Sequence, residues 1–148
     1  MRGTFEYDGA YYREIGEFIG ENYLKYGFVQ GTEQEVEFLV KGACRALKPG
    51  GWFVLTAIHA PAVIRGLEDP STYDPCTNTS VIREPATSPE GETKEVTFYT
   101  TAFTYRELAL MFEEAGFRVQ DAYGCIAGRF SRKPLEPDDV EIMVVARR

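Results

Sequence analysis

The sequence predicts an α/β fold, with helices packed on one small sheet and a β-hairpin inserted between two of its strands. An amphipathic helix leads through a Pro-Gly-Gly turn into a seven-residue apolar run, Trp52–Ile58, which is typical of a buried strand. A second helix begins at Thr104 and is followed by a strand, and a further apolar run, Val140–Ala146, comes last. Two strand-like segments flank a turn-rich stretch, PATSPEGET, and so predict the hairpin.

The first of these helices has the clearest signals. Thr32 and Glu35 stand three residues apart, the spacing of a capping box. The apolar residues that follow lie on one helical face: Val36, Leu39, Val40, Ala43, Cys44 and Leu47. The helix ends before Pro49, since the residue before a proline is disfavoured in helical conformation. We therefore expect Cys44 to be a small core residue and not a nucleophile.

The Trp52–Ile58 strand is apolar throughout, so we expect burial on both faces, as in a parallel sheet flanked by helices. A short helix around Pro61–Leu67 follows it. The hairpin arms are expected at Ser80–Glu84 and Lys94–Thr101, and the second arm alternates as a half-exposed antiparallel strand does.

The second long helix begins at Thr104, which forms another capping box with Glu107. It ends at Gly116, a residue type favoured just past a helix. A strand at Phe117–Tyr123 and a long loop then lead to the last strand, Val140–Ala146.

The length of 148 residues suits one domain, residues 1–148. Within it we distinguish an aromatic N-terminal cap, 1–31, from a lobe at 32–148. We expect one or two short helices in the cap, around Ala10–Ile19 and Glu21–Tyr26. The cap aromatics either pack on the core or form a lid over a ligand.

Composition excludes several classes of function. A net charge of −7 disfavours nucleic acid as a partner. No apolar run approaches the ~20 residues that span a bilayer, and the N-terminal residues lack the pattern of a signal peptide. Three cysteines without a CxxC motif indicate reduced thiols and a cytoplasmic protein. With His59 as the one histidine, no metal site is expected.

Four segments resemble class I S-adenosylmethionine-dependent methyltransferases. ALKPGGWFVLTA resembles their late helix-to-strand passage, YRELALMFEEAGFRV the helix before their penultimate strand, and DDVEIMVVARR their final, antiparallel strand. ENYLKYGFVQGTEQEVEFL resembles the cap before the first strand in a bacterial branch of the family. The resemblance implies a truncated Rossmann-like methyltransferase fold, whose small mixed sheet has an antiparallel last strand.

The segment that carries the cofactor site in this family is absent. The cap joins the late helix at about Val40–Lys41, and the strand with its glycine-rich loop is missing between them. Gly50–Gly51 follows a helix, and GCIAG at 124–128 is not followed by one, so neither meets the requirement for such a loop. The resemblance implies S-adenosylmethionine as cofactor, but no residue here is predicted to bind it. A natural deletion, a degenerate paralogue and an edited sequence all remain compatible with this join.

Candidate site residues come from the cap, the insertion and the strand ends. His59 follows the Trp52–Ile58 strand at its C-terminal end, where α/β folds place their sites. Histidine is the residue type whose unperturbed pKa lies near neutrality. His59 is either a general base or an exposed or capping histidine. The candidate substrate-binding residues are Tyr23, Tyr26, Gln30, Tyr99 and Arg129. The tyrosines could equally be packing residues, and Arg129, with Arg132 and Lys133, could equally be a solvated face.

Two functions compete on this sequence. The first is methyl transfer to an unknown small-molecule acceptor, impaired by the missing loop. The second is a noncatalytic module that binds a small ligand or dimerises. In the family the LKPGG strand lies between an earlier strand and the last one, so its omission leaves an apolar edge open. We therefore expect a homodimer, formed through the Trp52–Ile58 edge or by exchange of caps.

Overall fold

The computed structural model describes residues 17–18, 33–126 and 129–148. The chain falls into two compact units, one of residues 1–30 with 81–99 and one of residues 31–80 with 100–148. Of the helix expected at Ala10–Ile19, only Glu17 and Phe18 are described, and both are helical. The Thr32 cap and the expected helix at Glu21–Tyr26 lie outside the described residues. The single domain remains a prediction.

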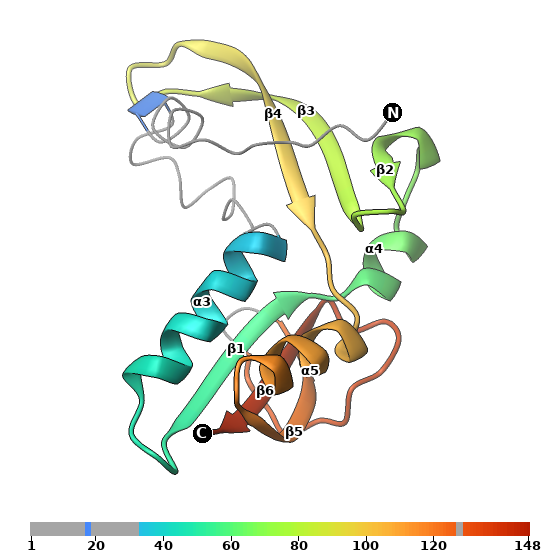
Figure 1. The fold of residues 1–148 in the computed structure, drawn as a ribbon. Helices are drawn as coiled ribbons and strands as arrows, with labels where there is room; N and C mark the ends of the chain where they lie inside the picture. The colour runs from blue at the N-terminus through green and yellow to red at the C-terminus, as the bar shows by residue number, and fades with distance from the viewer. Residues whose placement is uncertain (1–16, 19–32, 127–128) are drawn as a thin grey trace. The chain divides into compact units, whose positions relative to one another are not determined.

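The sheet of the second unit has three strands: β1 (Trp52–Ile58), β5 (Arg118–Cys125) and β6 (Glu141–Arg147). Their order is β1-β6-β5, and β6 pairs antiparallel with both neighbours, so β1 and β5 run in the same direction (Figure 1). The last strand is therefore the central, antiparallel one. This confirms the fold class predicted from the sequence.

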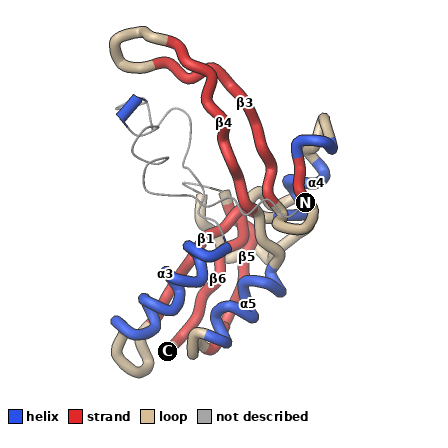
Figure 2. The backbone as a smooth tube through the Cα atoms, turned by 45° about the horizontal axis from the view of Figure 1, so that its top comes forward, coloured by secondary structure: helices blue, strands red, loops and turns tan. Residues whose placement is uncertain are grey.

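Two helices lie on the same face of this sheet, α3 (Glu33–Ala46) and α5 (Tyr105–Glu114), as Figures 1 and 2 show. α3 continues without a break through Val40–Lys41, and Val40 is fully buried. The second capping box is confirmed. Glu107 N–H donates to Thr104 Oγ1 at 3.3 Å, and Thr104 N–H donates to Glu107 Oε2 at 2.6 Å.

The core lies between these two helices and the sheet. Phe53 of β1 stacks on Phe112 and Phe117, with ring centroids 5.6 and 5.2 Å apart. Cys44 is buried among apolar residues, as expected. The buried core residues are Val40, Cys44, Ala57, Phe103, Leu108, Phe112, Phe117, Ile142, Val144 and Ala146.

The opposite face of β1 is largely exposed, and the expectation that β1 is buried on both faces is wrong. Trp52 is 57% exposed and Val54 is 52% exposed. Side chains alternate along a strand, so Phe53, Leu55 and Ala57 pack into the core while Trp52 and Val54 point the other way. An apolar run shows what a strand is able to bury, but it does not show that both faces are covered.

The segment after β1 contains a short helix, α4 (Ala60–Arg65), a 3₁₀ turn, η2 (Pro70–Thr72), and β2 (Tyr73–Asp74). β2 pairs with the first residues of β3 (Thr79–Thr87), in a second sheet of order β2-β3-β4.

The expected hairpin is present, formed by β3 and β4 (Thr93–Thr101). Both of its arms are longer than predicted, and residues 81–99 belong to the first compact unit. Within that unit, Lys94 Nζ lies 5.5 Å from the centroid of the Phe18 ring.

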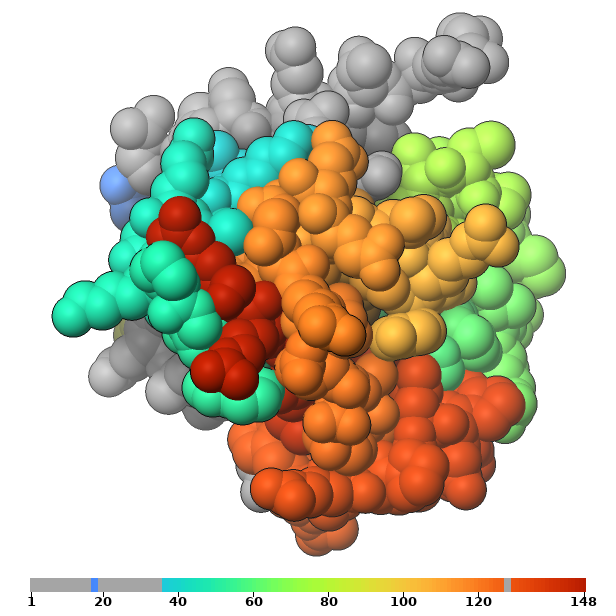
Figure 3. Space-filling view, turned by 60° about the horizontal axis from the view of Figure 1, so that its bottom comes forward, coloured from blue at the N-terminus to red at the C-terminus, as the bar shows by residue number. Residues whose placement is uncertain are grey.

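The turn from α3 into β1 is tied to the end of β6. Gly50 has φ +79°, a conformation that glycine adopts without strain, and its N–H donates to the Arg148 carbonyl at 2.7 Å. Arg147 Nε donates to the Gly50 carbonyl at 2.9 Å, and its guanidinium lies 5.4 Å from the Trp52 ring centroid. Figure 3 shows the red end of β6 against the green segment that leads into β1.

Candidate functional site

Among the predicted site residues that the structure describes, His59 alone lies in a buried polar setting, with a side chain 5% exposed. It follows β1 directly and occupies the N-cap position of α4, although its side chain makes no capping bond. Its main chain is fixed on two sides, because His59 N–H donates to the Val140 carbonyl at 2.9 Å and the His59 carbonyl accepts from Ala62 N–H at 3.1 Å. The histidine is neither exposed nor a side-chain cap.

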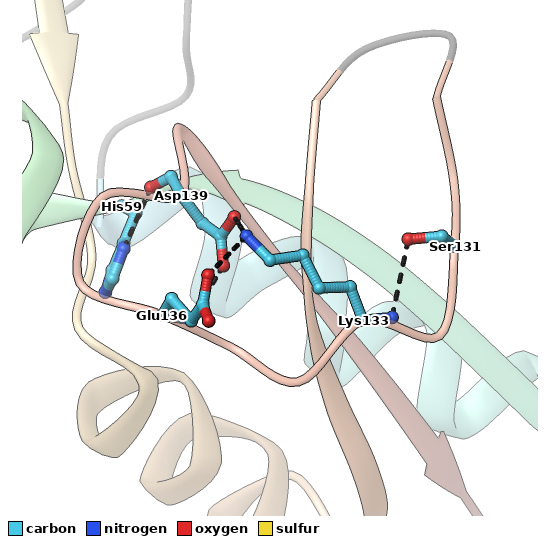
Figure 4. A network of polar contacts seen from close by, with 5 residues as sticks. All are labelled: His59, Ser131, Lys133, Glu136 and Asp139. Carbon is cyan, nitrogen blue, oxygen red and sulfur yellow. Dashed lines mark hydrogen bonds and ion pairs between the residues drawn. The ribbon is translucent and has the colours of Figure 1, made fainter.

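The imidazole of His59 is held by the main chain of the loop before β6. Nδ1 lies 2.9 Å from the carbonyl oxygen of Asp139 (Figure 4). A carbonyl oxygen accepts hydrogen bonds and cannot donate, so the neutral ring carries its proton on Nδ1. Nε2 then holds the lone pair, and no hydrogen bond from a described residue engages it. A neutral imidazole fixed in this form is able to accept a proton at Nε2.

The carboxylate of Asp139 is also held, and only 10% of its side chain is exposed. It accepts from Lys133 Nζ at 2.8 Å and from Glu136 N–H at 2.7 Å. Those two bonds, the one from Lys133 first, hold the pKa of Asp139 below its ordinary value. Asp139, and after it Glu136, raises the pKa of Lys133, so the pair stays ionised at neutral pH.

Gly124 of β5 packs directly against the Asp139 carboxylate. A Cβ atom at position 124 would lie 1.7 Å from Asp139 Oδ2, far inside van der Waals contact. Gly124 N–H donates to the Lys133 carbonyl at 3.1 Å, which joins β5 to the same loop. A residue with a side chain at position 124 would therefore displace the carboxylate.

The other predicted site residues are not gathered around His59. Tyr23, Tyr26 and Gln30 lie outside the described residues. Tyr99 belongs to β4 in the first compact unit, half-buried and with an interaction partner of its own. Arg129 is exposed, and its N–H donates to the Ile126 carbonyl at 2.9 Å. The substrate-binding roles of these five residues remain predictions.

Sequence reasoning missed the most informative partner of His59. Asp139 stands 80 residues away and contributes a main-chain oxygen, which leaves no trace in side-chain identity. Lys133 was considered only as a solvated or anion-binding residue, whereas its ammonium is engaged by two carboxylates, including Glu136 Oε2 at 2.6 Å.

A shallow hollow lies beside Phe103, whose main chain bridges to His59. Its volume is about 270 Å³ including its open mouth, below the size of a typical small-molecule pocket. Its polar groups already bond to one another, because Asn78 Nδ2 donates to Glu107 Oε1 at 3.0 Å and Tyr73 donates to Asn78 Oδ1 at 2.9 Å. The hollow is lined by Cys76, Thr77, Asn78, Thr101, Ala102, Phe103, Glu107 and Met111.

The described glycines do not form a cofactor loop. Such a loop joins a strand to a helix and lets the backbone approach the ligand. Gly50 turns from a helix into a strand, and the space above Gly124 is filled by the protein's own Asp139 carboxylate. The described glycines therefore form no loop of the kind that holds S-adenosylmethionine in this way. The described residues also include no cluster of three metal-ligating side chains, and none of their helices is long and apolar enough to cross a membrane.

Solved structures share this fold. The CcbJ methyltransferase from Streptomyces caelestis superposes with a TM-score of 0.60 at 20% identity, over 78% of this chain and 54% of that one. An S-adenosylmethionine-dependent methyltransferase from Clostridium acetobutylicum ATCC 824 gives a TM-score of 0.53 at 14% identity, over 78% of this chain and 51% of that one. No family model and no curated protein matches the sequence.

These similarities define the fold alone, because the identities are low. The chain has the fold of part of an S-adenosylmethionine-dependent methyltransferase, as its sequence predicted, and spans about half the length of those solved structures. The fold does not identify a reaction, which depends on the site.

Proposed function

We propose that this chain is the acceptor side of a methyltransferase, which orients a small-molecule nucleophile and takes its proton at His59. One observation carries the proposal. His59 is buried at the C-terminal end of β1, with Nδ1 committed to the Asp139 carbonyl. Catalytic groups of open α/β sheets lie at that end of the strands.

The role of His59 follows from its tautomer. A hydroxyl or amine acceptor loses a proton as it becomes methylated, and a base within hydrogen-bond reach assists that loss. Nε2 of His59 has the required lone pair, and burial limits the motion of the ring. Positioning of the nucleophile contributes much of the remaining rate in reactions of this kind.

The methyl donor is the part of the proposal that the described residues do not supply. S-adenosylmethionine, when bound, provides an electrophilic methyl group, but the described residues form no loop to hold it. We therefore expect methyl transfer by the isolated chain to be weak, and we assign it no cofactor residue.

Transfer of a labelled methyl group from S-adenosylmethionine to a pool of small hydroxyl and amine acceptors tests this function. We expect slow transfer that falls at least about 100-fold in His59→Gln, the contribution usual for a general base. Lys48→Gln, which changes an exposed residue of the α3–β1 turn, serves as the control and keeps the rate. No transfer, together with no heat and no thermal shift at millimolar S-adenosylmethionine, would remove the proposal.

A second candidate function, homodimerisation, is favoured by the open edge of β1. Among the described strands, β1 pairs only with β6, and its other edge carries one bridge at its end, where Phe103 N–H donates to the Ile58 carbonyl at 2.7 Å. The Gly51 carbonyl accepts from Arg148 N–H at 3.0 Å, and His59 N–H donates to the Val140 carbonyl at 2.9 Å. In an antiparallel pair, alternate residues of a strand direct their N–H and C=O groups to the same edge. The odd-numbered residues of β1 therefore direct theirs toward β6. The even-numbered residues Trp52, Val54 and Thr56 direct theirs to the other edge.

That edge suits a second copy of the same strand. WFVLTAI has no charge and no proline, the usual devices that protect an edge from pairing. If two copies pair antiparallel about Val54, then Trp52 of each copy faces Thr56 of the other, and every outward N–H and C=O of the three residues finds a partner. A two-fold axis through Val54 generates this self-complementary contact.

The mass in solution tests dimerisation, measured by sedimentation at micromolar concentration. We expect twice the chain mass of 16.7 kDa for the wild type and the single mass for Val54→Lys, which places a charge on the edge. Ile64→Lys is the matched control, because Ile64 on α4 is 51% exposed and Val54 is 52% exposed. A monomeric wild type contradicts the dimer, and a dimeric Val54→Lys variant excludes this edge and leaves exchange of caps.

A further inference from the structure

The two ends of the loop from Lys133 to Asp139 are joined by hydrogen bonds of its own side chains. Lys133 Nζ reaches across the loop to Asp139 Oδ1 at 2.8 Å, and the Asp139 carboxylate also accepts from Glu136 N–H at 2.7 Å. Asp139 N–H donates in turn to the Glu136 carbonyl at 3.1 Å. The positions of Asp139 and Glu136 are thus fixed by main-chain and side-chain bonds together.

The Lys133 end of this loop is anchored to β5. Gly124 N–H in β5 donates to the Lys133 carbonyl, and Pro134 forms an isolated bridge with Tyr123. The Asp139 carboxylate rests against Gly124, where even a methyl group would overlap it. Rotation of Asp139 is therefore limited by the strand as well as by the loop.

Asp139 also contacts His59 through its main chain. Its carbonyl oxygen lies 2.9 Å from Nδ1 of His59 (Figure 4). The side chain of Asp139 faces Lys133 while its main chain faces His59, so one residue links the ion pair to the imidazole. An unattached imidazole interconverts between two neutral forms, and the partner of one nitrogen selects between them.

We propose that Asp139 and Lys133 are positioning residues, which hold His59 with its proton on Nδ1 and present Nε2 as the proton acceptor. Asp139 acts through its carbonyl, and Lys133 acts by fixing the carboxylate of the same residue. Neither residue touches the acceptor. The purpose of the arrangement rests on the proposed function, but the tautomer itself does not.

The sequence makes this inference directly measurable, because His59 is the one histidine of the chain. Nitrogen-15 NMR of the imidazole therefore reports a single pair of ring nitrogens, whose shifts distinguish the two neutral forms. We expect the Nδ1–H form to predominate in the wild type above neutral pH. Predominance of the Nε2–H form would overturn the inference.

Two variants test the positioning residues. Lys133→Met removes the ion pair while keeping most of the side-chain length, and we expect the share of the Nδ1–H form to fall at least about three-fold relative to the Nε2–H form. Asp139→Asn keeps the size and the main-chain carbonyl but loses the charge that Lys133 holds, and we expect the same direction with a smaller change. Lys48→Met is the control and leaves the ratio unchanged.

The backbone amide spectrum shows whether each variant keeps the fold. An unchanged tautomer ratio in a folded Lys133→Met variant would show that the ion pair is structural only and would overturn the role of Lys133. If Lys133→Met fails to fold, the ratio in Asp139→Asn decides in its place. Absence of methyl transfer with the expected ratios would remove the proposed function and leave the positioning inference standing.

Discussion

The two faces of the three-stranded sheet carry similar apolar residues, but the described helices cover only one of them. Along β6, Ile142, Val144 and Ala146 are fully buried beneath α3 and α5, while Met143 and Val145 between them are only half-buried. β1 repeats the contrast, with Ala57 buried and Trp52 largely exposed. Apolar content therefore does not decide which face is covered. The helices that connect to the strands decide it, and both long described helices lie on one face.

The largest effect expected from this contrast concerns stability. Phe112→Ala removes a fully buried ring stacked on Phe53, and we expect a loss of about 3–5 kcal/mol in the free energy of unfolding. Trp52→Ala on the open face should cost less than about 1 kcal/mol in the monomer. Both values can be measured by urea unfolding at the lowest practical protein concentration, which favours the monomer. Similar losses for the two variants would show that the open face is covered in solution.

The three cysteines provide a second comparison, since Cys44 lies in the covered core, Cys125 at the buried end of β5 and Cys76 in an exposed loop. Burial, and then the nearby Glu141 carboxylate, raises the pKa of Cys125 to about 11. Because the thiolate is the reactive form, its population at pH 8 falls about 100-fold for two pKa units. We expect iodoacetamide to modify Cys76 first, as mass spectrometry of timed samples would show. Early labelling of Cys44 would indicate that the covered face opens.

A smaller effect concerns how the covering helix α5 begins. Thr104→Ala removes the oxygen that accepts from Glu107 N–H, and we expect a loss of about 1 kcal/mol. Thr104→Ser keeps that oxygen and is the control. Thermal unfolding of the two variants should separate them, and equal midpoints would mean that packing alone fixes the start of α5.

The smallest effect concerns the loop at the strand ends, which belongs to neither face. The folded state lowers the pKa of Asp139, so its stabilising contribution is complete above the unfolded pKa of about 4. It is lost as the pH falls through the lower, folded value. We expect unfolding free energy to decrease on acidification below about pH 4, and to decrease less in Asp139→Asn. Parallel pH profiles would contradict the proposed ion pair with Lys133.

Local signals predicted the elements of this fold well. β1 has the bounds expected from its apolar run, and α5 begins at the predicted capping box, because both depend on neighbouring residues in sequence. The open face could not be predicted in this way, since burial of Trp52 depends on what lies across the sheet. The setting of His59 was equally hidden, because its partner is a main-chain oxygen from a distant loop. The position of His59 at a strand end was predicted, and its tautomer was not.

The central place of β6 also has a consequence for synthesis of the chain. Neither β1 nor β5 has its partner in this sheet until residues 141–147 have been made, since β6 lies between them. At about 5–20 residues per second, the ribosome needs roughly 5–20 seconds to travel from the end of β1 to the end of β6. During that interval the uncharged β1 segment is available to other chains and to chaperones. Slow codons in the second half of the gene would lengthen this exposure, and rapid translation would shorten it.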